Sequence, residues 1–72
     1  MPRPRQLKIL GDAIRTHRDQ TGMSQEKLAE KADLHPNYIG EVERGEKTIS
    51  VDALVRVAKA LKVRLAALVQ DI

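Results

Sequence analysis

The 72-residue sequence predicts an all-α fold, and three observations support this. Apolar residues recur three or four positions apart, as on one face of a helix. No alternating run of Val, Ile and Thr indicates a strand. Four apolar pairs, five positions apart, each straddle a plausible helix start, which is the hydrophobic-staple arrangement. The pairs are Met23 with Leu28, Leu34 with Ile39, Ile49 with Leu54, and Val63 with Leu68.

These signals predict five helices in a single compact domain. Their expected ranges are about 6–21, 24–32, 36–44, 50–61 and 65–71. We see no internal repeat and no linker that would divide the chain, so the domain is expected to cover residues 7–72. Residues 1–6 are expected to form a flexible basic arm, because two prolines within the first four residues fix φ and remove backbone donors.

The first helix is predicted from the helical spacing of Leu7, Leu10, Ile14 and His17. Gly22 follows this helix and supplies a stop signal, since glycine readily adopts the left-handed conformation that ends many helices. His17 places a polar atom on the face that is otherwise apolar, and a partly buried, hydrogen-bonded histidine is its expected state.

The later helices are predicted from their start signals. Ser24 and Ser50 are favourable N-caps, and Pro36 falls at a first helical position, where its missing N–H is harmless. His35 and Arg64 also stand at expected N-cap positions, but both are weak capping residues. The third and fifth helices therefore have the weakest start signals.

Composition excludes several classes of protein. The chain has no Cys, and its two histidines are isolated, so we expect neither a disulfide nor a metal site. It also lacks a Gly-rich phosphate loop and is too short to enclose a pocket, so we expect no enzyme activity and no cofactor. No apolar run could span a membrane or serve as a signal peptide, which predicts a cytoplasmic protein.

The net charge of +3 is unevenly distributed. Residues 1–18 contain five basic residues and one acid, whereas residues 19–51 contain four basic residues and seven acids. Because nucleic acids usually meet a basic surface, the acidic middle segment counts against such a partner. The basic first helix could nevertheless flank the same surface.

Four groups of residues, in order and spacing, are similar to the lambda-repressor-like helix-turn-helix family of the Cro/repressor or XRE type. The groups are Ile14-Arg15 with Arg18, Gly22 to Ala29, Tyr38-Ile39 with Glu43-Arg44-Gly45, and Leu54 with Ala58 and Leu61. The resemblance covers about residues 7–70 and places the helix-turn-helix at about 24–44. It implies a five-helix, usually dimeric domain that binds a roughly palindromic operator as a transcriptional regulator.

The resemblance also implies site residues, with the helix from Pro36 as the recognition helix. The residues expected at DNA are Gln25, Pro36, Asn37, Tyr38, Gly40, Glu41, Arg44 and Lys47. Asn37 could pair with adenine, and Glu41 could accept from cytosine N4. Gln25, Arg44 and Lys47 would face backbone phosphates. Ile39 and Val42 would turn into the core.

Several of these assignments have structural alternatives. Tyr38 could touch a phosphate or pack along its own helix, and Glu41 could instead belong to a solvated face. Gly40 weakens the recognition helix by about 1 kcal/mol relative to Ala. The resemblance also implies a buried, structural ion pair between Arg18 and Glu43.

Three further positions carry expectations. Asp33 stands where the family turn often has Gly, and Asp tolerates the left-handed conformation. Arg3 and Arg5 in the arm could enter a minor groove, although a solvated tail is the commoner outcome.

Apolar residues crowd the C-terminal end of the chain beyond the needs of one small core. We hypothesise that some of them form a two-fold dimer interface, the alternative being that all pack internally. They are Leu61, Val63, Leu65, Leu68, Val69 and Ile72.

The predicted function is a sequence-specific DNA-binding transcriptional regulator, acting as a homodimer on an inverted-repeat operator in the prokaryotic cytoplasm or nucleoid. Restriction-modification controllers and phage or plasmid repressors are short proteins of this kind. The alternative is an antitoxin-like or other protein-interaction module with the same fold, for which DNA is secondary. Double-stranded DNA and a second copy are the expected partners, with no small-molecule ligand.

Overall fold

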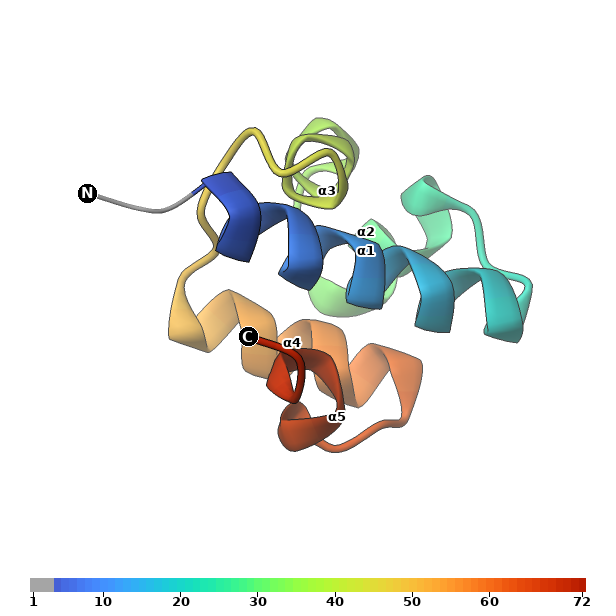
Figure 1. The fold of residues 1–72 in the computed structure, drawn as a ribbon. Coiled ribbons are helices and arrows are strands. Elements are labelled where there is room, and N and C mark those ends of the chain that lie inside the picture. Colours follow the sequence, from blue (N-terminus) through green and yellow to red (C-terminus); the bar gives the residue numbers. More distant parts are fainter. Residues whose placement is uncertain (1–3) are drawn as a thin grey trace.

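The computed structural model describes residues 4–72 and contains five helices over that range, with no strand. They are α1 (Pro4–Thr21), α2 (Gln25–Ala32), α3 (Pro36–Glu43), α4 (Val51–Leu61) and α5 (Leu65–Val69) (Figure 1). The predicted all-α fold is therefore confirmed, and each helix boundary lies within two residues of its expected position. Of the described helices, none is both long and apolar enough to cross a membrane.

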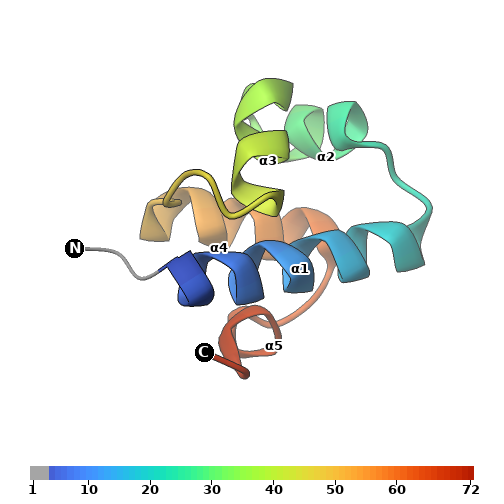
Figure 2. The ribbon, with the colours of Figure 1, turned by 45° about the horizontal axis from the view of Figure 1, so that its top comes forward.

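The helices form a short stack. α2 and α3 lie together on one side of α1 and α4, and α5 lies on the other side (Figure 2). α1 packs against α3, α4 and α5, while α2 packs against α3 and α4. The second and third helices are thus presented at one end of the molecule, supported from below by the first and fourth.

The four staple pairs form much of the core. Their inner members, Leu28, Ile39, Leu54 and Leu68, are all buried. Their outer members are half-buried and pack against the same core. Since each outer residue precedes its helix, these contacts fix the direction in which the chain enters α2, α3, α4 and α5.

The capping residues behave as their chemistry predicts. The Ser24 and Ser50 hydroxyls each accept a hydrogen bond from the backbone N–H three residues later, at 3.0 and 3.1 Å. Nδ1 of His35 accepts from the N–H of Asn37 at 3.1 Å, so this weak capping residue does cap α3. Arg64 makes no capping bond, and α5 is the shortest helix.

Two non-glycine residues end helices in the left-handed conformation. Asp33 has φ 57° and ψ 50°, as expected, and its N–H donates to the carbonyls of Ala29 and Glu30. Lys62 ends α4 in the same way, with φ 59°. Nothing in the residue type of Lys62 predicted this, because lysine has no local side-chain bond that favours positive φ.

The predicted N-terminal arm is too long. Residues 4–6 are helical, because proline is tolerated in the first turn, where its missing N–H has no intrahelical acceptor. Arg5 therefore lies on α1, exposed. The rest of the predicted arm, including Arg3, lies outside the described residues.

The hypothesis of a C-terminal dimer interface must also be corrected. Leu61 and Leu68 are 3% and 1% exposed, because α4 and α5 turn them into the core of their own chain. Neither can line an interface between copies. Val63 and Val69 are half-buried against the same core, whereas Leu65 and Ile72 remain exposed at 37% and 50%.

α1 crosses the C-terminal end of α3 so closely that the backbones of the two helices are in contact. A Cβ atom added to Gly11 would lie 2.6 Å from the carbonyl oxygen of Glu43 and would also collide with that of Val42. Real Cβ atoms do not approach backbone oxygens so closely. Glycine at this position is therefore what allows α1 to contact the C-terminal end of α3.

Candidate nucleic-acid interface

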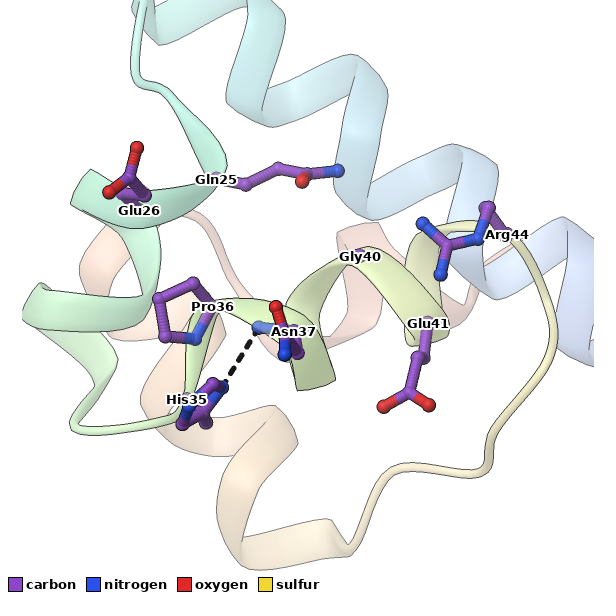
Figure 3. A pocket seen from close by; sticks show the side chains of 8 residues that line it. All are labelled: Gln25, Glu26, His35, Pro36, Asn37, Gly40, Glu41 and Arg44. Carbon is purple, nitrogen blue, oxygen red and sulfur yellow. Dashed lines mark hydrogen bonds between the residues drawn. The ribbon is translucent and has the colours of Figure 1, made fainter.

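A groove of about 590 Å³ lies between the start of α2 and the length of α3 (Figure 3). Its lining is largely polar and comes from eight residues. They are Gln25, Glu26, His35, Pro36, Asn37, Gly40, Glu41 and Arg44. The structure thus brings together the two helices on which the sequence analysis placed its site.

Six of the eight residues predicted to face DNA line this groove. The two that do not are Tyr38 and Lys47. Glu26 and His35 line it without having been predicted to. Both are sequence neighbours of predicted site residues, Gln25 and Pro36, which could have indicated that they line the groove. His35 was predicted only as a capping residue.

The side chain of Tyr38 lies outside the lining of the groove. Tyr38 is half-buried and packs against the core, and its hydroxyl donates to the carbonyl of Thr48 at 3.1 Å. It therefore ties α3 to the loop that leads into α4. The half-buried ring thus packs against the core, while its contact with a DNA phosphate stays a prediction.

Arg44, at the end of α3, is held by an acid of the same chain. Its Nε and Nη2 donate to the two carboxylate oxygens of Glu46 at 3.0 and 3.2 Å. The hydrogen bond to Glu46 raises the pKa of Arg44, and the same bond lowers the pKa of Glu46. Both side chains are more than half exposed, so solvent screens this pair.

Lys47 is engaged in a similar but looser way. Its Nζ lies 3.6 Å from Oε1 of Glu41, which is one of the groove residues. Lys47 is therefore beside the groove, although it does not line it. The two basic side chains that the sequence assigned to phosphates are both paired with carboxylates.

Gly40 leaves space above α3. Gln25 from α2 and Arg44 from the end of α3 both extend over it (Figure 3). A Cβ added to Gly40 would lie 3.1 Å from Nη1 of Arg44 and 3.4 Å from Oε1 of Gln25. Only the weakening of the helix by glycine was predicted. The approach of these two side chains could not be, because they come together only when α2 and α3 pack against each other.

Gln25 is less free to meet a phosphate than predicted. Its Nε2 donates to Oε1 of Glu43 at 2.9 Å. Since a carboxylate only accepts, this bond fixes which end of the amide faces inward. The carbonyl oxygen Oε1 is left on the side of Gly40, where it can accept a hydrogen bond.

The ion pair between Arg18 and Glu43 is present beneath the groove. Nε and Nη2 of Arg18 donate to the two oxygens of Glu43 at 2.7 and 3.0 Å, and Nη1 donates to the carbonyl of Met23 at 2.9 Å. The side chains are 11% and 2% exposed. The hydrogen bond to Glu43 raises the pKa of Arg18, against the opposing effect of burial.

This network joins three helices. Arg18 comes from α1, Gln25 from α2 and Glu43 from α3, and Glu43 contacts both of the others. The carboxylate thereby fixes the position of α3 relative to the start of α2. The two walls of the groove are thus held together by buried, charge-assisted hydrogen bonds.

The turn between α2 and α3 is secured from a fourth helix. Nη1 of Arg56 in α4 donates to the backbone carbonyl of Asp33 at 3.2 Å, and its Nη2 lies 3.1 Å from a carboxylate oxygen of Asp52. Nε of Arg56 is buried without a hydrogen-bond partner among the described residues. No local pattern predicts this contact, which links residues 23 positions apart.

The groove offers donors and acceptors suited to a base edge. The Asn37 amide provides both, Glu41 and the Gln25 carbonyl accept, and Arg44 donates. Such groups can recognise adenine and cytosine amino groups and guanine acceptors in a major groove. Two short helices at a tight turn, one of them lining an exposed polar groove, define the helix-turn-helix class of proteins.

Comparison with known proteins agrees with this class. The model of the helix-turn-helix family matches residues 14–68, and the chain belongs to that family. Control protein C.SmaI of Serratia marcescens is 44% identical over 54 residues, which are 75% of this chain and 64% of that protein. Control protein C.BamHI of Bacillus amyloliquefaciens is 42% identical over 57 residues, or 78% of this chain and 70% of that one.

A solved structure extends the similarity to three dimensions. The restriction-modification controller protein C.AhdI from Aeromonas hydrophila superposes with a TM-score of 0.85 at 35% identity, covering 86% of this chain and 94% of that protein. The chain therefore matches nearly all of one controller protein, and slightly less than two thirds of C.SmaI.

Proposed function

We propose that this chain is a sequence-specific DNA-binding transcriptional regulator of the restriction-modification controller type. The observation that carries the proposal is the groove itself. In a chain that belongs to the helix-turn-helix family, six of the residues expected at DNA line one polar surface along α3. The similarity to C.SmaI, C.BamHI and C.AhdI supports the regulator type.

In the proposed complex, α3 lies in the major groove with Asn37 and Glu41 at base edges. Asn37 is exposed near the start of α3, and residues at the start of a recognition helix are those that reach bases. Arg44 and Lys47 contact the backbone on leaving their carboxylate partners. The Gln25 carbonyl accepts from a base amino group or from Arg44.

The proposed assembly is a homodimer on an inverted repeat. A two-fold dimer would place its recognition helices about 34 Å apart, so that they read half-sites one DNA turn apart. Leu65 and Ile72 are the exposed apolar residues of the C-terminal end, and we assign them to the dimer interface together with the half-buried Val63 and Val69. Such a regulator works in the prokaryotic cytoplasm or nucleoid.

Selection from random duplexes tests the proposal. Enrichment should return an inverted repeat, and Asn37→Ala should weaken binding to it by about 1–3 kcal/mol. Gln20→Ala is the matched control, because it removes an exposed amide at the end of α1, outside the groove. Recovery of no enriched site would reject the proposal.

A second candidate function is a protein-interaction module that uses the groove for a partner protein. The observation that favours it is the acidity of the groove, whose lining includes Glu26 and Glu41 but only one arginine, Arg44, which is already paired with Glu46. Equal binding of DNA by Asn37→Ala, Gln20→Ala and the unaltered chain would favour this candidate. Loss confined to Asn37→Ala would reject it.

A further inference from the structure

The cations expected at the DNA backbone are neutralised by the chain itself. Glu46 binds Arg44 through two hydrogen bonds of 3.0 and 3.2 Å. Glu41 lies 3.6 Å from the ammonium group of Lys47. A phosphate that approached either cation would meet a carboxylate already in place.

Some exposed cations outside the groove are also paired, such as Lys8 with Asp12 at 2.8 Å and Lys27 with Glu30 at 3.0 Å. Within residues 4–72, Lys31, Lys59 and Lys62 have no carboxylate within 4.0 Å, although all three are exposed. They lie with Arg56 around a separate hollow between α2 and α4. Both cations expected at the DNA backbone thus belong to the paired group, unlike these three lysines.

The backbone fixes the position of Glu46. Gly45 ends α3 with φ 73°, and its N–H donates to the carbonyl of Val42 at 3.0 Å. The N–H of Glu46 donates to the carbonyl of Glu41 at 2.9 Å. These two bonds form a Schellman motif, which holds the residue after the glycine against the helix end. The carboxylate is thereby kept next to Arg44.

We propose that Glu46 lowers the affinity of the groove for DNA by competing with a backbone phosphate for Arg44. The inference rests on the proposed function and adds a residue that limits binding. A phosphate and a carboxylate are both bidentate acceptors for a guanidinium, so only one of them can hold the same edge of Arg44. When the phosphate displaces it, the negative charge of Glu46 stays nearby and repels the DNA.

This competition does not depend on base sequence. Every duplex presents phosphates at the same spacing, so Glu46 weakens binding to specific and nonspecific DNA alike. The base contacts of Asn37 are unaffected. The residue thus keeps nonspecific binding low and leaves recognition to the base edges. Its pKa is lowered by Arg44, so the carboxylate is ionised at neutral pH.

The test measures the salt dependence of binding for Glu46→Gln and Glu46→Ala, on the selected inverted repeat and on a scrambled duplex. We expect both variants to bind both duplexes about two- to fivefold tighter at low salt, the range for an exposed charge pair. The slope of log K against log salt should steepen by up to about 0.9, as for one further phosphate contact. Glu46→Gln should have the smaller effect, since its amide oxygen still accepts from Arg44.

Two controls separate the proposal from a general charge effect. Glu30→Gln removes the same charge from an exposed acid that pairs with Lys27 at 3.0 Å outside the groove, and it should change affinity little. When Arg44 is already replaced by alanine, Glu46→Gln should raise the affinity for DNA much less than it does in the unaltered chain. Melting followed by circular dichroism checks that each variant is folded.

Two results would overturn the proposal. One is a gain for Glu46→Gln no larger than that for Glu30→Gln, and the other is a full gain that persists without Arg44. Either can occur while the unaltered chain still binds its inverted repeat, which leaves the proposed function standing. Failure of the unaltered chain to bind any duplex would instead reject both.

Discussion

The molecule contains two arginine–glutamate pairs of nearly equal geometry in opposite surroundings. Arg18–Glu43 and Arg44–Glu46 each have two hydrogen bonds between guanidinium and carboxylate, of 2.7–3.0 and 3.0–3.2 Å. The first pair is buried between helices, and the second is more than half exposed beside the groove. Burial, rather than bond length, therefore decides whether such a pair stabilises the fold or can be exchanged for a ligand.

The two pairs also differ in their neighbours. Glu43 accepts from Gln25 as well as Arg18, so its loss would affect three helices. Glu46 contacts only the residue two positions before it and its own turn. The interior pair can be changed only together with the fold, whereas the exterior pair can be altered while the fold is kept.

The largest expected effect is from Glu43→Ala. Removing this carboxylate takes the bidentate partner from the largely buried Arg18 and leaves only Asp19, at 3.6 Å, as a nearby carboxylate. The free energy of unfolding should therefore fall, by up to about 3–5 kcal/mol. Urea unfolding followed by circular dichroism measures it. Glu46→Ala is the matched exposed variant and should leave the midpoint nearly unchanged. Equal losses for the two variants would contradict the comparison.

Replacing both members of the interior pair should be milder than replacing one. Arg18→Met with Glu43→Leu removes both charges, and apolar pairs of similar volume often replace buried ion pairs at little loss. We expect the double variant to be more stable than either single variant, because neither charge is then left without its partner. A double-mutant cycle in urea measures this. Additive losses would show that the two residues act independently.

A smaller effect is expected at Gly40, between the two pairs. Gly40→Ala should stabilise the helix by about 0.5–1 kcal/mol, because alanine is the better helix former. The new Cβ would meet only the ends of two flexible side chains, Arg44 and Gln25, which can move. Thermal melting should show the gain, while titration with the selected duplex should show weaker binding. A loss of stability would mean that these side chains cannot shift.

The smallest effect concerns the titration of Glu46. Its pKa is lowered by the hydrogen bond from Arg44, so the contribution of this pair to stability is present above the ordinary pKa of a glutamate. That contribution disappears as the pH falls through the lowered value. NMR titration of the carboxylate should show the low pKa, and Arg44→Ala should return it toward the ordinary range. An unchanged pKa in that variant would refute the pairing in solution.

Much of the fold could be predicted because its signals are local. Each staple pair and each serine cap lies within one turn of the helix it starts, and all of them form as expected. The left-handed turn at Asp33 was predicted for the same reason. For Leu61 and Leu68 the sequence left internal packing and a dimer interface open, because spacing identifies an apolar face without saying which partner covers it.

The site was predicted less completely. The family resemblance placed the site on α2 and α3 and supplied the Arg18–Glu43 pair. The inward turn of Tyr38 and the space above Gly40 depend on contacts between distant residues. Glu46 had no assigned role, since a carboxylate after a glycine reads as part of an ordinary solvated turn.

The close crossing at Gly11 has a consequence for how this domain can change over time. The tilt of α3 against α1 is fixed where the Cα of Gly11 meets the backbone carbonyls of Val42 and Glu43. These are backbone atoms, so the contact does not depend on the surrounding side chains. Substitutions along the groove can therefore accumulate without turning the helix that carries them. New target sequences become accessible by exchanging a few exposed residues, provided that position 11 stays a glycine.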